Sequence, residues 1–324
     1  MRAYIIRRLL FLIPTLLGLT IILFYVVQLV PGDVIDRMQM VPDIQLDRAE
    51  LERQLGYDRP LIIQYARWMG FIPDVNGKFT GIMQGDLGQS HLQQTSVIKL
   101  VSISWPITLE LGLFAFILAQ AIAVPIGTYS AIRQDRIGDY IGRSFSILAV
   151  AIPSFWLGTM VMIFPALWWD YMPPMFIVRF FDDPMENIRM FFAPVIVLGL
   201  SASGASMRIT RTQVLEVLRQ DYIRTAWAKG FTERVVIMRH ALKNALIPVI
   251  TGMGLQVPVL IGGTVIIEEI FVLPGMGSLI INSLLERDKE LTCGVIFIFG
   301  CLLVLINLLV DLSYAFFDPR VQYK

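Results

Sequence analysis

Charged side chains are scarce in this chain. Lys, Arg, Asp and Glu make up 16% of the 324 residues, whereas a soluble domain typically contains about 25%. The charges are also unevenly placed, because six windows of 18 to 26 residues contain none. These windows are Leu9–Gly32, Leu111–Ile132, Ser144–Trp169, Met190–Met207, Asn244–Ile267 and Leu291–Val310. A soluble fold has no reason to repeat an uncharged stretch of this length six times.

Cysteine and histidine are nearly absent as well. Cys293 and Cys301 are eight residues apart, about 12 Å of rise on one helix, which is too far for a disulfide between them. His91 and His240 are isolated from each other and from the cysteines. The sequence therefore carries no metal or redox motif, and we expect the chain itself to bind no cofactor and to hold no catalytic residue.

The most prominent feature of the sequence is instead the set of six uncharged windows. A helix needs about 20 residues to cross the hydrocarbon layer of a bilayer, and backbone amides in lipid must be satisfied within the segment. The sequence thus predicts an all-α polytopic membrane protein with six transmembrane helices. The first window follows Arg2, Arg7 and Arg8 but exceeds the apolar core of a signal peptide, and Val30–Asp33 is not a cleavage site. We therefore expect it to be retained as the first span.

The distribution of Lys and Arg predicts an orientation. With the N-terminus inside, the inner segments carry 16 basic residues and the outer segments carry 11, spread over more residues. The bias in the short loops places both termini of this multi-pass membrane protein in the cytoplasm. The basic residues lie next to the spans and show no base-reading motif, so nucleic acid is not an expected partner.

The chain divides accordingly into four parts. Residues 1–32 form a cytoplasmic tip and the first span, 33–104 an extracytoplasmic segment, 105–318 the transmembrane core with a cytoplasmic loop at 208–243, and 319–324 a cytoplasmic tail. In the extracytoplasmic segment we expect a short helix capped by Asp43 or Asp47 and by Gly56, a second at Leu61–Trp68, and a loop at Phe71–Gly88.

Glycine and proline are frequent within the spans, where small residues ordinarily let helices approach. The stretch Gly252–Gly263 is dense enough in both that we expect kinks there. Charges inside the spans are few, with Glu110 and Asp311 near predicted ends, and no inverted repeat is visible. Both facts argue against a proton-coupled pump or a transporter built from internal repeats.

The most informative segment is the basic loop, Arg208–Lys243. It contains eight basic residues against three acids and lies between two uncharged windows. At its centre is Asp-Tyr-Ile-Arg-Thr-Ala-Trp-Ala-Lys-Gly, residues 221–230. A basic, helix-forming loop between two spans is suited to receive a soluble partner. About half of these charges need no explanation beyond the positive-inside bias.

The centre of the basic loop resembles the signature of binding-protein-dependent ABC importer permeases. Ala226, Gly230 and Leu242 match that signature, while Arg224 and Thr225 depart from Glu-Ala-Ala, and His240 and Lys243 from Ile-x-Leu-Pro. The departures look like the oligopeptide, dipeptide and nickel permease branch, B-type subunit. The fragments that resemble this branch are residues 7–9, 31–33, 55–61, 85–90, 153–158, 221–230, 239–248, 271–277 and 318–321. Phe71–Gln84 looks longer than is usual for the branch.

The resemblance implies a type I importer fold with one peripheral helix and a five-helix core. In the family, the basic loop forms a coupling helix that docks on an ATPase subunit. Gly230 suits a helix end, and Trp227 offers a rigid apolar anchor for the partner. The residues assigned to ATPase coupling are Arg224, Thr225, Ala226, Trp227, Lys229, Gly230 and Arg234.

A second candidate site lies at Glu268–Gly277. Its two glycines and one proline favour a tight turn, and we expect Phe271, Leu273 and Met276 to form an apolar tip facing outward. In the family this loop helps to gate the path beneath a binding protein; a simple interfacial loop is the alternative. The residues assigned to the extracytoplasmic gate are Glu269, Phe271, Pro274, Gly275, Met276 and Gly277.

The resemblance also implies the partners. These are a homologous second permease subunit, two ATPase subunits that bind ATP and Mg, an extracytoplasmic solute-binding protein and the lipid bilayer. Di- or oligopeptides are the expected substrates, with nickel chelates, glutathione and oligosaccharides left open; the substrate-binding residues stay unassigned. A stand-alone channel or secondary transporter would need a polar lining or repeats. An intramembrane enzyme would need a catalytic motif that the sequence lacks.

Overall fold

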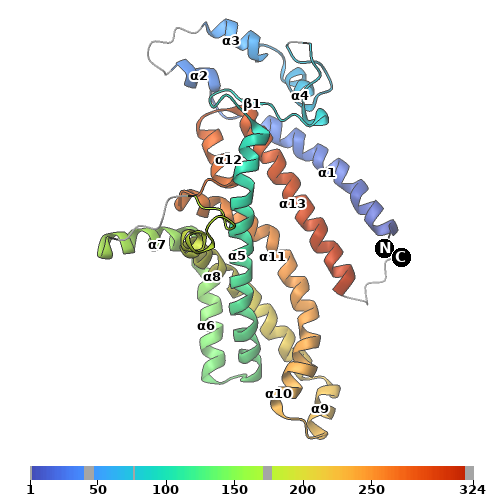
Figure 1. Ribbon diagram of the computed structural model, residues 1–324. Helices are drawn as coiled ribbons and strands as arrows, with labels where there is room; N and C mark the ends of the chain where they lie inside the picture. The colour runs from blue at the N-terminus through green and yellow to red at the C-terminus, as the bar shows by residue number, and fades with distance from the viewer. Residues whose placement is uncertain (1, 40–46, 76, 171–176, 318–324) are drawn as a thin grey trace. The chain divides into compact units, whose positions relative to one another are not determined.

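The computed structural model describes residues 2–39, 47–75, 77–170 and 177–317. Helices dominate the part of the chain that it describes (Figure 1). In order they are α1 (Arg2–Gln28), α2 (Val34–Gln39), α3 (Arg48–Leu55), α4 (Leu61–Met69), η1 (Ile82–Gln84), α5 (Val97–Ile132), α6 (Ile137–Ala151), α7 (Ser154–Trp169), α8 (Pro184–Leu218), α9 (Asp221–Ala228), α10 (Glu233–Val235), η2 (Val236–Leu242), α11 (Lys243–Ile270), α12 (Met276–Leu285) and α13 (Lys289–Phe317). Strands β1 (Gln89–Ser90) and β2 (Thr95–Ser96) form an antiparallel hairpin in which Gln89 pairs with Ser96.

The helices confirm the predicted membrane architecture. Five helical segments of the described chain are long and apolar enough to cross a bilayer: Ile6–Gln28, Val97–Ile132, Pro184–Leu218, Glu233–Ile270 and Lys289–Leu312. A sixth candidate consists of α6 and α7, which meet at 92°. Each overlaps one of the uncharged windows of the sequence.

The bend between α6 and α7 corrects one expectation. Ser144–Trp169 does not form a single straight helix, because Ile152 is extended, with φ of −80° and ψ of 119°, and α7 begins directly after Pro153. Proline has no N–H to donate and disfavours helical geometry in the residue before it. By contrast, α11 continues as one helix through Gly252–Gly263, and the kinks expected there stay a prediction.

The chain forms two compact units. Unit 1 contains Met1–Ile107 and Pro274–Leu305, and unit 2 contains Thr108–Leu273 and Ile306–Lys324. The residues of each unit pack together, but this packing is independent of the side of the membrane on which a segment lies. The predicted division into cytoplasmic and extracytoplasmic parts therefore stays a prediction.

Unit 1 is built around α1, α4 and the first half of α13. Leu23, Phe24, Val27 and Cys293 are buried, and Tyr65, Trp68, Ile296 and Phe297 pack against them. The ring of Phe24 lies 5.5 Å from that of Tyr65 and 5.8 Å from that of Trp68. A hydrogen bond of 3.0 Å joins the hydroxyls of Thr20 and Tyr65. These aromatic contacts hold the short helix α4 against the first predicted span.

The two short helices predicted in this unit are confirmed. The Asp47 carboxylate accepts a hydrogen bond of 3.0 Å from the N–H of Ala49 at the start of α3. Gly56 ends α3 with φ of 75°, a left-handed conformation that glycine adopts without a steric penalty. The second helix, α4, extends one residue beyond the predicted end, to Met69. In the expected loop at Phe71–Gly88, the described residues 71–75 and 77–88 contain the single helical turn η1 and are otherwise irregular.

Arg48, the first residue of α3, ties the neighbouring segments together. Its guanidinium forms ion pairs with Asp33 at 2.8 Å, with Glu52 at 2.7 Å and with Asp36. Arg287 lies 3.5 Å from the other carboxylate oxygen of Asp36. The hydrogen bond from Arg48 lowers the pKa of Asp36 below its usual value. A charged network therefore joins α2, α3 and the segment before α13.

Unit 2 is built around α8, which contacts α6, α7 and α11. Small residues line its buried face and let the neighbouring backbones approach. The hydroxyl of Ser146 on α6 donates a hydrogen bond of 2.8 Å to the carbonyl of Gly204 on α8. Ser206 donates one of 2.8 Å to the Gln256 side chain on α11. Serine and glycine on α8 thus join it to α6 on one side and to α11 on the other.

Gly204 leads to a prediction about this packing. A Cβ atom at this position would lie 2.7 Å from the Ser146 carbonyl oxygen, a backbone atom that cannot move alone. We expect Gly204→Ala to lower the stability of the chain in detergent by about 1–3 kcal/mol, the usual cost of overpacking. Gly262→Ala in α11 is the matched control, because nothing lies within 4 Å of its added Cβ. Equal thermal unfolding midpoints for the two variants would contradict the packing argument.

Candidate functional site

The basic loop folds into three short helical pieces between α8 and α11. The helix α8 continues to Leu218, so Arg208 and Arg211 belong to a membrane-crossing helix and not to the loop. After α9, Gly230 adopts a φ of 76°, which is the left-handed conformation expected of a glycine that ends a helix. The chain then re-enters a helix at Glu233 and continues through η2, a π-helical stretch, into α11.

One face of α9 is packed against unit 2. Ile223 and Ala226 are buried and form a cluster with Val236 and Ala241 of η2; Val217 and Leu218 at the end of α8 pack against this cluster. The Tyr222 hydroxyl also accepts a hydrogen bond of 3.0 Å from the Asn244 side chain. The end of α8 and the start of α11 therefore both contribute contacts to the seat of α9.

The other face of α9 is open. The Trp227 side chain is 46% exposed, and the Arg224 side chain, 3.4 Å from Asp221, is 76% exposed. Thr225, Lys229, Gly230 and Arg234 are exposed as well. Of the seven residues assigned to coupling, only Ala226 is buried, so it contributes to the seat of α9 and not to its open surface.

The sequence analysis missed the contacts that brace this segment. Glu233 of α10 forms an ion pair of 3.1 Å with Arg133, which follows α5. The ring of Phe231 stacks on that of His240, with ring centres 5.6 Å apart. These pairs join residues far apart in the sequence or separated by a turn, and no motif of the loop indicates them. The segment that follows α9 is consequently also joined to the end of α5.

The turn after α11 differs from the expectation for the second candidate site. The chain does turn tightly here, since the N–H of Leu273 bonds to the carbonyl of Glu268 at 2.8 Å. The left-handed residue is Val272, with φ of 53°, and not a glycine. Phe271, Leu273 and Met276 are 4%, 3% and 0% exposed.

The predicted apolar tip facing outward is therefore wrong. The turn directs these three side chains inward, and Val272 is the apolar residue that it exposes, at 61%. Of the residues assigned to the gate, Glu269 is exposed, Pro274 is partly exposed, and Gly275 and Gly277 are buried. The assignment of these residues to a gate stays a prediction.

Glu268 lies at the end of α11 with no exposed surface. The Thr108 hydroxyl on α5 donates a hydrogen bond of 2.7 Å to its carboxylate. The sequence placed Glu268 in an outer loop; the structure places it inside unit 2, where the bond to Thr108 joins α5 to α11. A buried carboxylate requires such partners, because its desolvation is costly.

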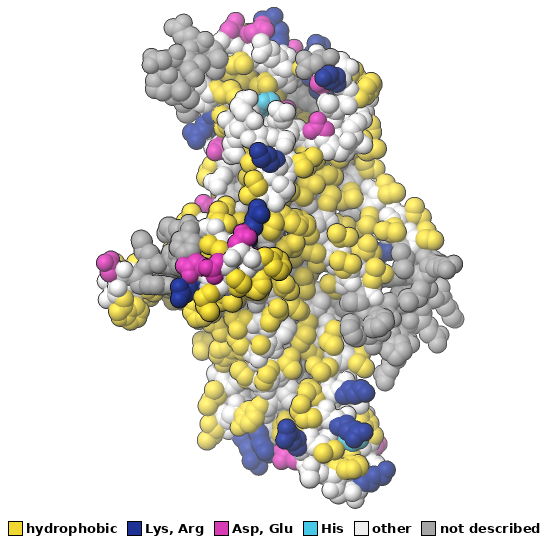
Figure 2. Space-filling model, viewed as in Figure 1, with side chains coloured by type: hydrophobic (Ala, Val, Ile, Leu, Met, Phe, Trp, Pro, Cys, Tyr) yellow, Lys and Arg dark blue, Asp and Glu magenta, His cyan; other side chains and the backbone are white. Residues whose placement is uncertain are grey.

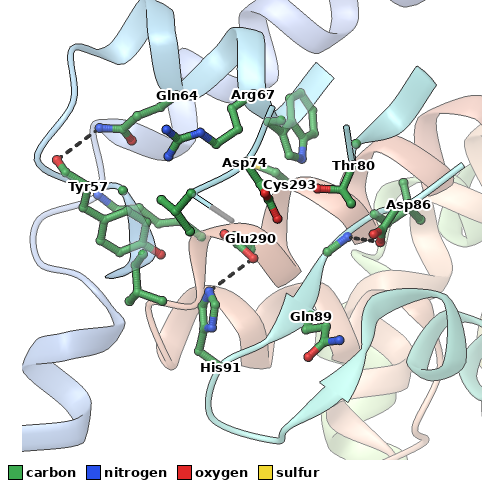
Figure 3. A pocket seen from close by; sticks show the side chains of 18 of the residues that line it. Tyr57, Gln64, Arg67, Asp74, Thr80, Asp86, Gln89, His91, Glu290 and Cys293 are labelled. Carbon is green, nitrogen blue, oxygen red and sulfur yellow. Dashed lines mark hydrogen bonds and ion pairs between the residues drawn. The ribbon is translucent and has the colours of Figure 1, made fainter. Parts of the chain in front are cut away.

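Unit 1 contains a polar cavity of about 390 Å³ (Figure 3). Its lining comes from the segment around α3 and α4, from the β1 region and from the start of α13. His91 and Glu290 point toward one another across it, with Nε2 and Oε2 3.2 Å apart. Burial alone would lower the pKa of His91, but Glu290 outweighs it and raises that pKa.

Asp288 anchors the hairpin beside this cavity. Its buried carboxylate accepts hydrogen bonds from the Ser90 hydroxyl at 2.8 Å and from the His91 N–H at 3.1 Å. It also accepts one from the N–H of Leu291 at 3.1 Å. No group of three or more His, Cys, Asp or Glu side chains within the described ranges is arranged to hold a metal ion. Through Asp288, the hairpin that lines part of the cavity is therefore joined to the start of α13.

Two family profiles together span the chain. Residues 123–323 match the binding-protein-dependent transport system inner membrane component, and residues 1–112 match the N-terminal domain of such membrane components. The chain belongs to this family. It is a permease subunit of the ABC transporter class, and a multi-pass inner membrane protein.

Curated relatives of this permease match it along its full length. It is 37% identical to the oligopeptide transport system permease protein AppB of Bacillus subtilis over 326 residues, with 100% of both chains covered. It is 34% identical to the dipeptide transport system permease protein DppB of Escherichia coli over 348 residues, again with 100% of both covered.

Solved structures show the same fold. An inward-facing structure of the MetNI methionine ABC transporter has a TM-score of 0.56 and 15% identity, covering 68% of the permease and 97% of the solved chain. An amino acid ABC transporter crystallised with histidines has a TM-score of 0.52 and 14% identity, covering 67% and 94%. These likenesses confirm the importer permease fold expected from the basic loop.

Proposed function

We propose that this permease forms half of the translocation pathway of an ATP-driven importer for di- or oligopeptides. The observation that carries the substrate class is the full-length similarity to permeases named for oligopeptide and dipeptide transport. The other half of the pathway is a homologous permease subunit. A solute-binding protein delivers the peptide, and two further subunits bind ATP and Mg and hydrolyse the ATP.

The basic loop is the part of the permease that receives an ATPase subunit. Three properties support this assignment: α9 exposes Trp227, it carries exposed basic residues, and its opposite face is packed against the end of α8 and against η2, which leads into α11. A closure of the ATPase subunits then moves α9, and α9 moves the spans. This is a two-state element biased by nucleotide bound to another subunit.

The same assignment fixes the orientation. The basic loop and both termini face the cytoplasm, in agreement with the positive-inside bias. The part of unit 1 that contains the cavity beside His91 then faces the solute-binding protein. The residues from Glu269 to Gly277 lie where the peptide enters.

Reconstitution tests this function. We expect proteoliposomes that contain this permease, its partner permease and both ATPase subunits to accumulate a labelled dipeptide only when ATP and the peptide-loaded binding protein are supplied. Vesicles that contain this chain alone are the control and should show no uptake. Uptake by the chain alone without ATP would instead identify a channel or a secondary transporter.

A further inference from the structure

A groove of about 230 Å³ lies between α6 and α8 in unit 2, and arginine dominates its lining. Arg143 of α6 and Arg208 and Arg211 of α8 contribute three guanidinium groups. Gly142 and Met207 also line the groove. None of the coupling or gate residues lines this groove, so it is a separate feature of the permease.

Two of the three arginines have no carboxylate to neutralise them. Arg211 is bound to Asp139 through two hydrogen bonds of 2.7 Å. Arg143 and Arg208 form no ion pair within the described ranges; the Arg143 guanidinium lies 5.6 Å from the centre of the Tyr140 ring. The groove therefore carries an excess of positive charge that calls for an anion.

The hydroxyl groups of the lining are already engaged. Ser130 donates to Asp139, Ser146 donates to the carbonyl of Gly204, and Thr212 donates to the carbonyl of Arg208. The guanidinium groups are thus the donors left for a ligand. Arginine binds the oxygens of a phosphate in a bidentate manner more effectively than it binds other groups of the same charge.

The surface beside the groove is apolar. Ile141, Ile147 and Leu148 of α6 are 65%, 63% and 57% exposed. In Figure 2 the end of unit 2 that carries α9 and α10 is rich in Lys and Arg, and the surface adjacent to it is hydrophobic. Arg143 lies six residues into α6, about 9 Å from the helix start, next to Tyr140, and tyrosine is a residue type enriched at the membrane–water interface.

We infer that this groove binds one anionic phospholipid, with its phosphate between Arg143 and Arg208 and an acyl chain along the apolar face of α6. A basic pocket between membrane helices is a recognised setting for an anionic headgroup. A carboxylate from a peptide or from another subunit would satisfy the charge but would leave Ile147 and Leu148 uncovered. The lipid satisfies both the arginines and the apolar flank.

The test uses the assembled transporter, titrated in detergent with phosphatidylglycerol or with phosphatidylcholine and analysed by native mass spectrometry. We expect selective retention of one phosphatidylglycerol per permease. We expect the double variant Arg143→Gln/Arg208→Gln to bind it about 30-fold more weakly, the loss expected when two arginines at an anionic headgroup are neutralised. The matched control is Arg219→Gln/Arg239→Gln, which removes the same charge from exposed positions of the basic loop.

Several outcomes would overturn the inference. Equal retention of the two lipids would remove the role of charge, and equal losses in the two double variants would show only general attraction to basic residues. Competition by inorganic phosphate at millimolar concentration would indicate a site for a free anion. Retention by the isolated chain that disappears on assembly would make the groove a subunit interface.

Discussion

We expect Trp227→Ala to abolish most ATP-driven uptake while leaving the permease folded. The Trp227 side chain is 46% exposed and is not part of the cluster that seats α9. Its removal should therefore change the stability of the isolated chain little. If α9 docks on an ATPase subunit as proposed, the same ring is a rigid apolar anchor, and truncation of such an anchor typically costs at least about 2 kcal/mol of binding, or roughly 30-fold in affinity.

Two control variants separate docking from folding. Ile223→Ala lies on the buried face of the same helix, where the side chain is 1% exposed, so it should lower thermal stability as well as uptake. Trp168→Ala removes a tryptophan of α7 that is 67% exposed and should affect neither coupling nor ATPase binding. The measurements are co-purification of the ATPase subunits, ATP hydrolysis and peptide uptake. Normal coupling in the Trp227→Ala transporter would refute the docking assignment.

Gly230, which follows the end of α9, provides a second test of the proposed docking on an ATPase subunit. Its φ of 76° is unfavourable for most residues, but nothing lies within 4 Å of an added Cβ, and Asn and Asp tolerate this conformation better than other residues do. Gly230→Asn and Gly230→Asp have nearly the same shape. A defect in uptake confined to Gly230→Asp would show that the partner surface rejects a negative charge at this position.

The membrane architecture could be predicted from the sequence because bilayer thickness and backbone hydrogen bonding constrain every span. The capped helix from Asp47 to Gly56 could also be predicted, because the residues that cap it are adjacent to it in the sequence. The break at Pro153 was not, because proline is frequent in spans and ordinarily tolerated there. Only the structure shows that Ile152 leaves the helix at this point.

In the candidate sites, too, features set by neighbouring residues in the sequence could be predicted, whereas contacts between distant residues could not. The helix-ending conformation of Gly230 followed from its place in the basic loop. The burial of Phe271 and Met276 could not be predicted, since it depends on how the turn folds back. The pair of Asp139 and Arg211 joins residues 72 positions apart, and a single sequence carries no signal for such a contact.

The carboxylate of Asp139 in that pair is bound on several sides within unit 2. Asp139 has no exposed surface. Its carboxylate accepts two hydrogen bonds of 2.7 Å from Arg211, one of 3.0 Å from the Asp135 N–H, and one from the Ser130 hydroxyl. The carboxylate therefore joins α5, the turn after it, α6 and α8.

We expect Asp139→Ala to destabilise the permease by about 3–5 kcal/mol, because it leaves a partly buried guanidinium without its counter-charge. The unfolding midpoint in detergent should fall by roughly 6–20 °C, on the scale of a domain of this size. Asp221→Ala is the matched control. It removes an aspartate from an arginine three residues away, but that aspartate is 95% exposed, and such surface pairs contribute little.

A second variant distinguishes the loss of a counter-charge from the loss of a contact. Asp139→Leu combined with Arg211→Met replaces both members of the pair by apolar groups, and replacement of a buried ion pair in this manner is often neutral or stabilising. The double variant should therefore be more stable than Asp139→Ala, although Ser130 and Asp135 still lose their acceptor. If the double variant is no more stable than Asp139→Ala, the unpaired charge of Arg211 is not what destabilises the single variant, and the hydrogen bonds lost with the carboxylate account for its effect.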